Sequence, residues 1–218
     1  MRRSLKVLAV LASGAFTLGA GASNASVIDF TSASTGHSGS LFGGKVTWTM
    51  TASGILNNNQ LYDGNTKPVG TGLAFERDGY GVGKNDDEIT TTPTKQEWIQ
   101  VSFSKPTFVD AFYYLDLFVA KNRKTWEVGQ AAVNGGAPYS LVATDVAGSG
   151  APGFVATVFK PILARVIRFT VLSSNDNYGF ADGALAGIGL APVPLPAAGL
   201  MMIAGLGGLA GLRRARKA

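Results

Sequence analysis

The chain has 218 residues, of which 46% are hydrophobic and 15% are charged, with no cysteine and a formal net charge of +5. The lack of cysteine excludes disulfides, a cysteine nucleophile and thiolate metal sites. Seven of the 19 basic residues lie at the two ends, which leaves 12 basic against 14 acidic residues in the body. The net positive charge therefore comes from the two ends and does not indicate nucleic-acid binding, so no nucleic-acid partner is expected.

The N-terminus has the three parts of a secretory signal peptide. Three basic residues among the first six precede an apolar run over residues 7–18, and small residues lead up to Ala25. This order predicts a signal helix in residues 1–25 that signal peptidase removes after Ala25. An uncleaved membrane anchor is the alternative, which the small residues before the cut disfavour.

Residues 26–191 are predicted to form one β-rich domain. Apolar and polar side chains alternate in most segments, as in strands with one buried face, and turn residues separate the segments. Asn134-Gly135 lies between two such segments and is a strong hairpin signal. The segments with strand patterns are 45–52, 97–103, 108–118, 128–133, 139–146, 164–172 and 183–190.

These segments predict an all-β fold class. No segment outside the two ends has a helical stripe of convincing length, so we expect about eight to ten short strands in two packed sheets. The architecture that fits is a β-sandwich of jelly-roll type, flanked by a terminal helix on either side. The aromatic-rich segment 108–118 is predicted to be a central strand, and 183–190 the last one.

Two polar loops of the body predict a calcium site. Calcium takes six to eight oxygen ligands from carboxylates, amides and backbone carbonyls, and both loops offer such oxygens. The spacing is not that of an EF-hand, and two solvated acidic turns remain the alternative. The candidate ligands are Asp78, Asn85, Asp86, Asp87, Glu88, Asp176 and Asp182.

Aromatic residues near turns predict a sugar platform, since sugar-binding sites combine aromatic faces with amide and carboxylate groups. Trp98 is out of phase with the apolar residues of 97–103 and would face outward, and Tyr80 lies in a Gly-rich stretch. Tyr62, Trp126 and Tyr178 are further candidates. A core position is the alternative for each of these rings.

Catalytic signals are sparse. The single histidine, His37, lies in a Ser/Gly-rich segment without a nucleophile-elbow motif, which indicates a surface loop rather than a catalytic triad. A hydrolase that uses a carboxylate pair remains open, with Glu76, Glu88, Glu97 and Glu127 as the available glutamates. The tight basic group Lys121, Arg123 and Lys124 is interpreted as a solvated turn.

The last segment of the chain, residues 192–218, combines a Pro motif, an apolar run and a basic end. Sixteen uncharged residues, 197–212, would make a helix about 24 Å long, enough to cross a locally thinned bilayer once. The basic end would stay in the cytoplasm. The motif is Val193, Pro194, Leu195, Pro196 and Ala197, and the basic stop is Arg213, Arg214, Arg216 and Lys217.

This tail resembles the VPLPA-CTERM sorting signal of the PEP-CTERM class. The resemblance covers only the tail, and it implies processing by an exosortase, which would cut near the Pro motif and move the protein outward. The protein would then be in the inner membrane transiently, as a precursor, and afterwards at the cell surface or in an extracellular matrix. A permanent C-terminal anchor is the alternative.

The function that these features predict is that of an exported, exosortase-sorted surface or matrix protein. Its β-sandwich would be non-catalytic and would bind extracellular polysaccharide, with calcium as the one candidate cofactor. An exported carboxylate-dependent hydrolase acting on extracellular polymer and a purely structural matrix protein are the alternatives.

Overall fold

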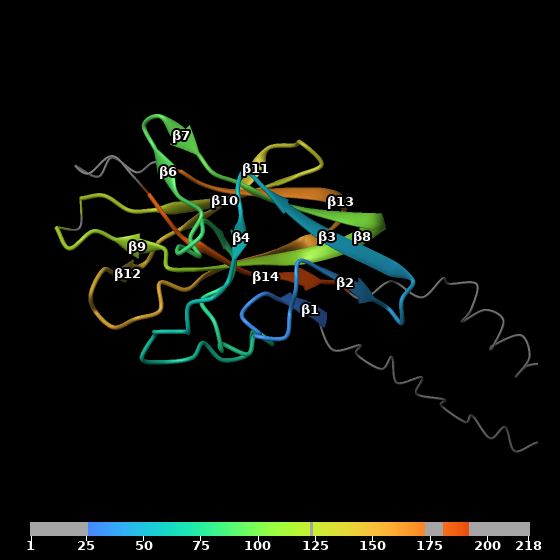
Figure 1. Ribbon diagram of the computed structural model, residues 1–218, viewed down its shortest axis with the longest axis horizontal. Coiled ribbons are helices and arrows are strands. Elements are labelled where there is room, and N and C mark those ends of the chain that lie inside the picture. The colour runs from blue at the N-terminus through green and yellow to red at the C-terminus, as the bar shows by residue number, and fades with distance from the viewer. Residues whose placement is uncertain (1–25, 123, 173–180, 192–218) are drawn as a thin grey trace, which may run out of the picture.

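The computed structural model describes residues 26–122, 124–172 and 181–191 (Figure 1). All regular secondary structure in these ranges is β-strand. The all-β prediction is thus confirmed for this part of the chain. The strands are β1 (Ser26–Asp29), β2 (Ser38–Leu41), β3 (Val46–Ala52), β4 (Leu56–Asn57), β5 (Gly81–Val82), β6 (Thr91–Thr92), β7 (Lys95–Gln96), β8 (Ile99–Leu115), β9 (Phe118–Val119), β10 (Val128–Val133), β11 (Pro138–Val142), β12 (Asp145–Val146), β13 (Val155–Leu172) and β14 (Ala184–Leu190).

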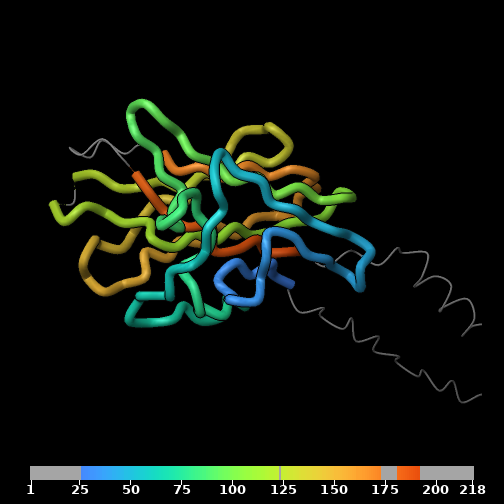
Figure 2. The backbone as a smooth tube through the Cα atoms, in the orientation of Figure 1, coloured from blue at the N-terminus to red at the C-terminus, as the bar shows by residue number. Residues whose placement is uncertain are grey.

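Two long antiparallel strands, β8 and β13, hold the fold together. The main sheet runs in the order β1-β14-β8-β13-β10-β11, and β3, which carries β2, also pairs with β8. The register divides β8 into two parts, because residues 99–103 pair with β3 whereas residues 109–115 pair with β14. The pairing of β8 with β13 shifts register twice, which marks bulges where both strands bend (Figure 2).

The bends create two layers that share β8 and β13. The first layer contains β2, β3, β10, β11, the first part of β8 and the second part of β13. The second layer contains β1, β14, the second part of β8 and the first part of β13. Phe112 of the second layer packs edge-on against Phe169 of the first, with ring centroids 5.5 Å apart. The Tyr114 hydroxyl lies 3.0 Å from the carbonyl oxygens of Gln130 and Thr170, to which it donates its one proton. The layers therefore face each other across one hydrophobic core.

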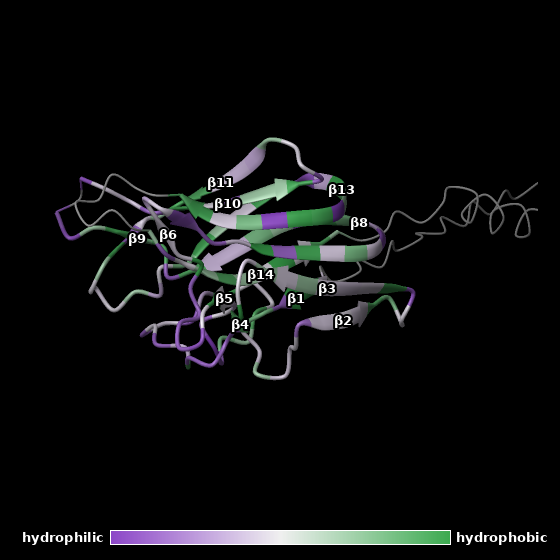
Figure 3. Ribbon diagram, turned by 45° about the horizontal axis from the view of Figure 1, so that its top comes forward, coloured by the Kyte–Doolittle hydropathy of each residue, from purple (hydrophilic) through white to green (hydrophobic). Residues whose placement is uncertain are grey.

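Local sequence explains the strands that the patterns predicted. In β3, Val46, Trp48 and Met50 are buried while the intervening threonines are exposed, as alternation requires. The β10–β11 hairpin turns at Asn134 and Gly135, whose φ angles of 51° and 74° suit the mirror-image turn that Asn-Gly favours. All residues of β14 are buried. Polar residues instead gather in the loops at the end of the molecule where β4, β5 and β9 lie (Figure 3).

The prediction of separate strands at 97–103 and 108–118 is wrong. Both belong to β8, which continues through Lys105 and Pro106 with exposed side chains. The Lys-Pro pair looks like a turn in sequence, yet a proline without an N–H is also tolerated at a bulge, and the strand bends there instead of ending. The first part of β13 was not predicted at all.

No helix among the described residues is long and apolar enough to cross a membrane. Several predictions concern residues outside the described ranges: the signal helix of 1–25, the helix within 197–212, the sorting motif Val193–Ala197, the basic stop at 213–217, and the candidates Asp176 and Tyr178.

Candidate metal centre

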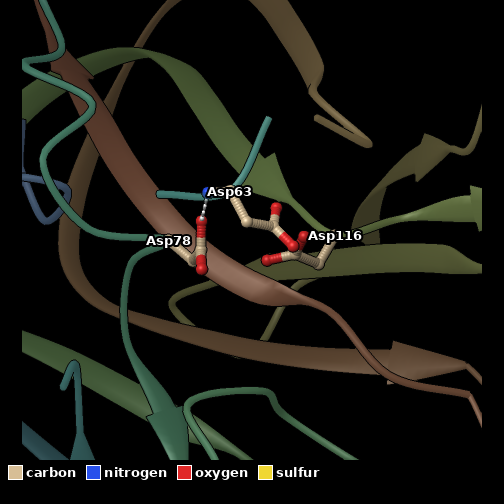
Figure 4. Close-up of side chains that lie close together, drawn as sticks. All are labelled: Asp63, Asp78 and Asp116. Atoms are coloured by element: carbon tan, nitrogen blue, oxygen red, sulfur yellow. Dashed lines mark hydrogen bonds between the residues drawn. The ribbon is translucent and has the colours of Figure 1, made fainter. Parts of the chain in front are cut away.

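Three carboxylates from distant parts of the chain meet at the polar end of the molecule (Figure 4). Asp63 lies in the loop after β4, Asp78 shortly before β5, and Asp116 directly after β8. One carboxylate oxygen from each lies within 4.8 Å of the others. The backbone N–H of Asp63 donates to Asp78 Oδ1 at 3.3 Å, which joins two of the three segments.

The trio opens into a pocket of about 300 Å³ that is rich in oxygen atoms. Five of the seven residues predicted as calcium ligands line it, namely Asp78 of the trio and four others, so the structure brings most of the predicted set to one place. The lining residues are Gln60, Leu61, Asp63, Asp78, Asn85, Asp86, Asp87, Glu88 and Asp116.

The loop that carries Asp86, Asp87 and Glu88 is held tightly against β5. The Val82 N–H donates to the Glu88 carbonyl at 2.9 Å, and the Asn57 side chain donates to the Asp86 carbonyl at 3.0 Å. A Cβ on Gly81 would lie 1.8 Å from the Asp87 carbonyl carbon, so only glycine fits beneath this loop. The acidic side chains therefore project from a fixed backbone.

Asp116 is placed by a sharp end to β8. Its φ angle of 58° is in the left-handed region, which aspartate tolerates better than most residues. The N–H groups of Asp116 and Leu117 donate to the Pro152 and Gly153 carbonyls at 3.2 and 3.0 Å. These bonds turn the chain out of the strand and leave the carboxylate inside the pocket.

Burial and mutual repulsion make the carboxyl groups hard to ionise. Burial, with a further contribution from neighbouring carboxylates, raises the pKa of Asp78 to about 7 and the pKa of Asp116 to about 9. The same two causes raise the pKa of Asp87 and of Glu88. Without a bound cation the site thus retains protons at neutral pH.

A second acidic pair, Glu127 and Asp182, extends the site. The Phe118 N–H donates to Glu127 Oε2 at 2.7 Å. Burial is the main cause that raises the pKa of Glu127, and the charge of Asp182 and a hydrogen bond to its side chain add to it. Asp182 is also the strongest carboxylate neighbour of Glu88. The predicted ligand Asp182 therefore lies beside the acidic pocket rather than in its lining.

The sequence did not indicate Asp63 or Asp116 as ligands. Asp63 stands in a Tyr-Asp-Gly turn, and Asp116 interrupts the apolar end of 108–118, where it was read as part of a strand. An aspartate inside an apolar strand pattern was the available signal, because a charge there requires a local partner or a functional reason.

Tyr80 is not a sugar platform, and this prediction is corrected. Its ring is 2% exposed and packs edge-on against Phe30, while its hydroxyl donates to the Thr35 carbonyl at 2.8 Å. The flanking glycines reflect close packing, since a Cβ on Gly79 would lie 2.5 Å from the Leu185 carbonyl oxygen.

Trp98 does lie on the outer face of the first layer, opposite in phase to the buried Ile99. One face of its ring is covered, because the Arg168 guanidinium carbon lies 4.3 Å from the ring centroid. Tyr62 is half-buried against Phe75, with ring centroids 5.3 Å apart. His37 is exposed, as predicted for a surface loop.

A second hollow, of about 410 Å³, lies between β1 and β2 and is lined mostly by serine, threonine and glycine. Its one carboxylate, Asp29, is already occupied: Oδ1 accepts from the Thr31 N–H and hydroxyl, and Oδ2 accepts from the Ala74 N–H. The hollow therefore offers no comparable cation site.

No family model and no curated protein matches the chain. Among solved structures, a pectin-binding carbohydrate-binding module is 16% identical, with 50% of this chain and 75% of that one covered and a TM-score of 0.30. CpGH89CBM32-5 from Clostridium perfringens, in complex with GalNAc-β-1,3-galactose, is 14% identical over 64% of this chain and 94% of that one, with a TM-score of 0.30. A truncated AlyQ with CBM32 and alginate lyase domains is 12% identical, with 52% of this chain but only 29% of that one covered and a TM-score of 0.34. None of these overlaps assigns the chain to a family.

Proposed function

We propose that the acidic pocket binds one Ca²⁺ ion, and that the domain is a non-catalytic, jelly-roll-type β-sandwich that binds extracellular polysaccharide. The observation that carries the metal site is the convergence of the Asp63, Asp78 and Asp116 carboxylates within 4.8 Å of one another. Burial and then repulsion raise the pKa of Asp78 and Asp116, and a cation there would relieve the repulsion.

The donor set favours calcium over other metals. Every side-chain ligand in the pocket is an oxygen donor, the chain has no cysteine, and His37 does not line the pocket. Structural zinc sites and copper sites use mainly nitrogen or sulfur ligands, whereas calcium accepts many oxygens in irregular geometry. Several loops supply the oxygens here, which suits an ion that tolerates uneven spacing.

The number of converging carboxylates also favours binding over hydrolysis. Retaining and inverting glycosidases use two carboxyl groups, one as the acid and one as the nucleophile or base. Here three carboxylates each bring one oxygen within 4.8 Å of the others. A shared cation explains the third carboxylate more simply than an acid and a nucleophile.

Calorimetric titration of the purified full chain with CaCl₂ tests the metal site. We expect one ion per chain, and a loss of affinity of at least about tenfold in Asp116→Asn, because one of the three converging carboxylates loses its charge. Asp110→Asn is the matched control, since Asp110 lies in β8, which ends just before Asp116, but does not line the pocket. No binding heat, together with a melting temperature that EDTA does not change, would refute the proposal.

We further propose that residues 192–218 are a sorting signal read by an exosortase, on the support of the three-part sequence pattern. Processing by signal peptidase and exosortase would carry the protein from the inner membrane to the surface or matrix. Replacing Pro194 and Pro196 with alanine is expected to leave the uncut precursor in the membrane fraction, while Pro192→Ala is processed normally. Equal processing of all three proteins in a pulse-chase experiment would contradict the proposal.

A further inference from the structure

The hairpin formed by residues 118–122 and 124–127, which begins with β9, projects at the end of the molecule where β9 and β12 lie (Figure 1). The Ala120 N–H donates to the Thr125 carbonyl at 2.9 Å, and the Glu127 N–H donates to the Phe118 carbonyl at 3.1 Å. On its other side, β9 pairs in parallel with β12. The hairpin is therefore a fixed element with pairing on both sides of β9.

The hairpin presents an exposed tryptophan. Trp126 is 49% exposed, the largest exposed fraction of any aromatic ring in the described ranges, and it pairs across the hairpin with Val119. Directly opposite residues of a hairpin share a face, and neighbours along the strand alternate. Trp126 thus projects from one face, while Glu127 belongs to the other, beside Asp182.

Two lysines of the same hairpin lie between Val119 and Trp126 in the chain and form no ion pair with an acidic residue of the described ranges. Lys121 and Lys124 are exposed, and neither has a carboxylate within 4.0 Å among the described residues, where the ion pair found joins Lys95 and Glu97. The Lys124 N–H donates to Asn122 Oδ1 at 2.9 Å. The body as a whole has more acidic than basic residues. The two lysines therefore make this part of the surface positive on a domain that is negative overall.

We propose that this hairpin is a binding site for a polysaccharide that carries carboxylate groups, such as a polyuronate. The proposal rests on the polysaccharide-binding function proposed above and names its site and ligand class. The apolar face of a pyranose ring would stack on the Trp126 indole, and the sugar carboxylates would pair with Lys121 and Lys124. Lys121 and Lys124, which the sequence places in a solvated turn, would then form the charged half of the site.

Three probes of equal length separate the contributions of ring and charge. Titrations of the calcium-loaded full chain would use hexagalacturonate, which has sugar rings and charge, maltohexaose, which has rings alone, and hexaglutamate, which has charge alone. We expect hexagalacturonate to bind at least tenfold more tightly than either of the others. Raising NaCl from 50 to 300 mM is expected to weaken that binding several-fold, because exposed charges are screened.

Variants assign the site. Trp126→Ala and the double change Lys121→Gln with Lys124→Gln are each expected to lower the affinity for hexagalacturonate at least tenfold. Phe42→Ala is the matched control, since Phe42 is also exposed, at 39%, but lies in the turn between β2 and β3. Its affinity is expected to equal that of the unchanged protein.

The outcomes distinguish this inference from the broader function. Equal binding of hexaglutamate and hexagalacturonate, or full affinity in Trp126→Ala, would overturn the hairpin site. Tighter binding of maltohexaose would overturn the ligand class but leave polysaccharide binding intact. Failure of both sugars to bind would overturn the inference together with that function, and release of new reducing ends would favour the hydrolase instead.

Discussion

Gly81→Ala is expected to lower the free energy of unfolding by about 3 kcal/mol and to weaken calcium binding. The added Cβ would lie 1.8 Å from the carbonyl carbon of Asp87 and 2.0 Å from the backbone nitrogen of Glu88. These are backbone atoms, so no rotamer change relieves the overlap. The loop must move away from β5, and the carboxylates of Asp87 and Glu88 move with it.

Urea unfolding followed by tryptophan fluorescence measures this effect. Gly36→Ala is the control, because a Cβ there has no neighbour within 4 Å and the φ angle of Gly36 is not in the left-handed region. We expect this control to stay within about 0.5 kcal/mol of the unchanged protein. Equal stability of Gly81→Ala and Gly36→Ala would show that residues 83–88 do not pack on β5 as described.

In a chelator, the melting temperature is expected to fall as pH rises from about 4 to about 9. The ordinary pKa of aspartate is 3.8, whereas the folded protein has a pKa of about 7 at Asp78 and about 9 at Asp116. Between these values the folded state binds more protons than the unfolded state, so stability decreases with pH. These two groups are most favourable to folding below about pH 4, and their contribution is lost as pH rises through the folded pKa.

Calcium is expected to reverse this trend. The ion competes with protons for the same oxygens, so its affinity rises over the same pH window. At one hundred times the dissociation constant it adds about 2.7 kcal/mol, which corresponds to roughly 5–10 °C in melting temperature for a domain of this size. Scanning calorimetry at pH 5, 7 and 9, with EDTA or CaCl₂, measures both trends.

Asp116→Asn sharpens the test. The amide stays neutral at every pH, so in EDTA at pH 9 this variant is expected to melt above the unchanged protein and to respond little to calcium. A melting temperature in EDTA that does not change between pH 5 and pH 9 would contradict the proton-binding site on which this expectation depends.

Local sequence patterns correctly predicted the elements whose structure depends on only a few neighbouring residues. The alternation of β3, the Asn134-Gly135 turn and the apolar run of β14 all correspond to observed structure. The continuity of β8 was missed, because Lys105-Pro106 has the local chemistry of a turn and only the pairing with β13 shows a bend.

The site was predicted in part for the same reason. Asp86, Asp87 and Glu88 are adjacent in sequence, so their loop was visible as an acidic run. Asp63 reaches the pocket from a distant loop, and Asp116 reaches it from the end of the long strand β8. No local sequence pattern encodes this convergence. The prediction for Tyr80 is wrong because a Gly-rich stretch is typical of an exposed turn, whereas these glycines allow close contact with β14.

The direction of β14 has a mechanical consequence. Its first residues follow Asp182 at the acidic end, while Leu190 pairs with Ser26 at the other end, so the strand runs from the acidic pocket toward Ala191. β14 lies between β1 and β8, antiparallel to both. A pull between a ligand at the acidic end and an anchor beyond Ala191 would load these hydrogen bonds across their length, in shear. All of them would have to break together, so the domain is oriented to resist force along this axis far better than a pull that peels β1 away.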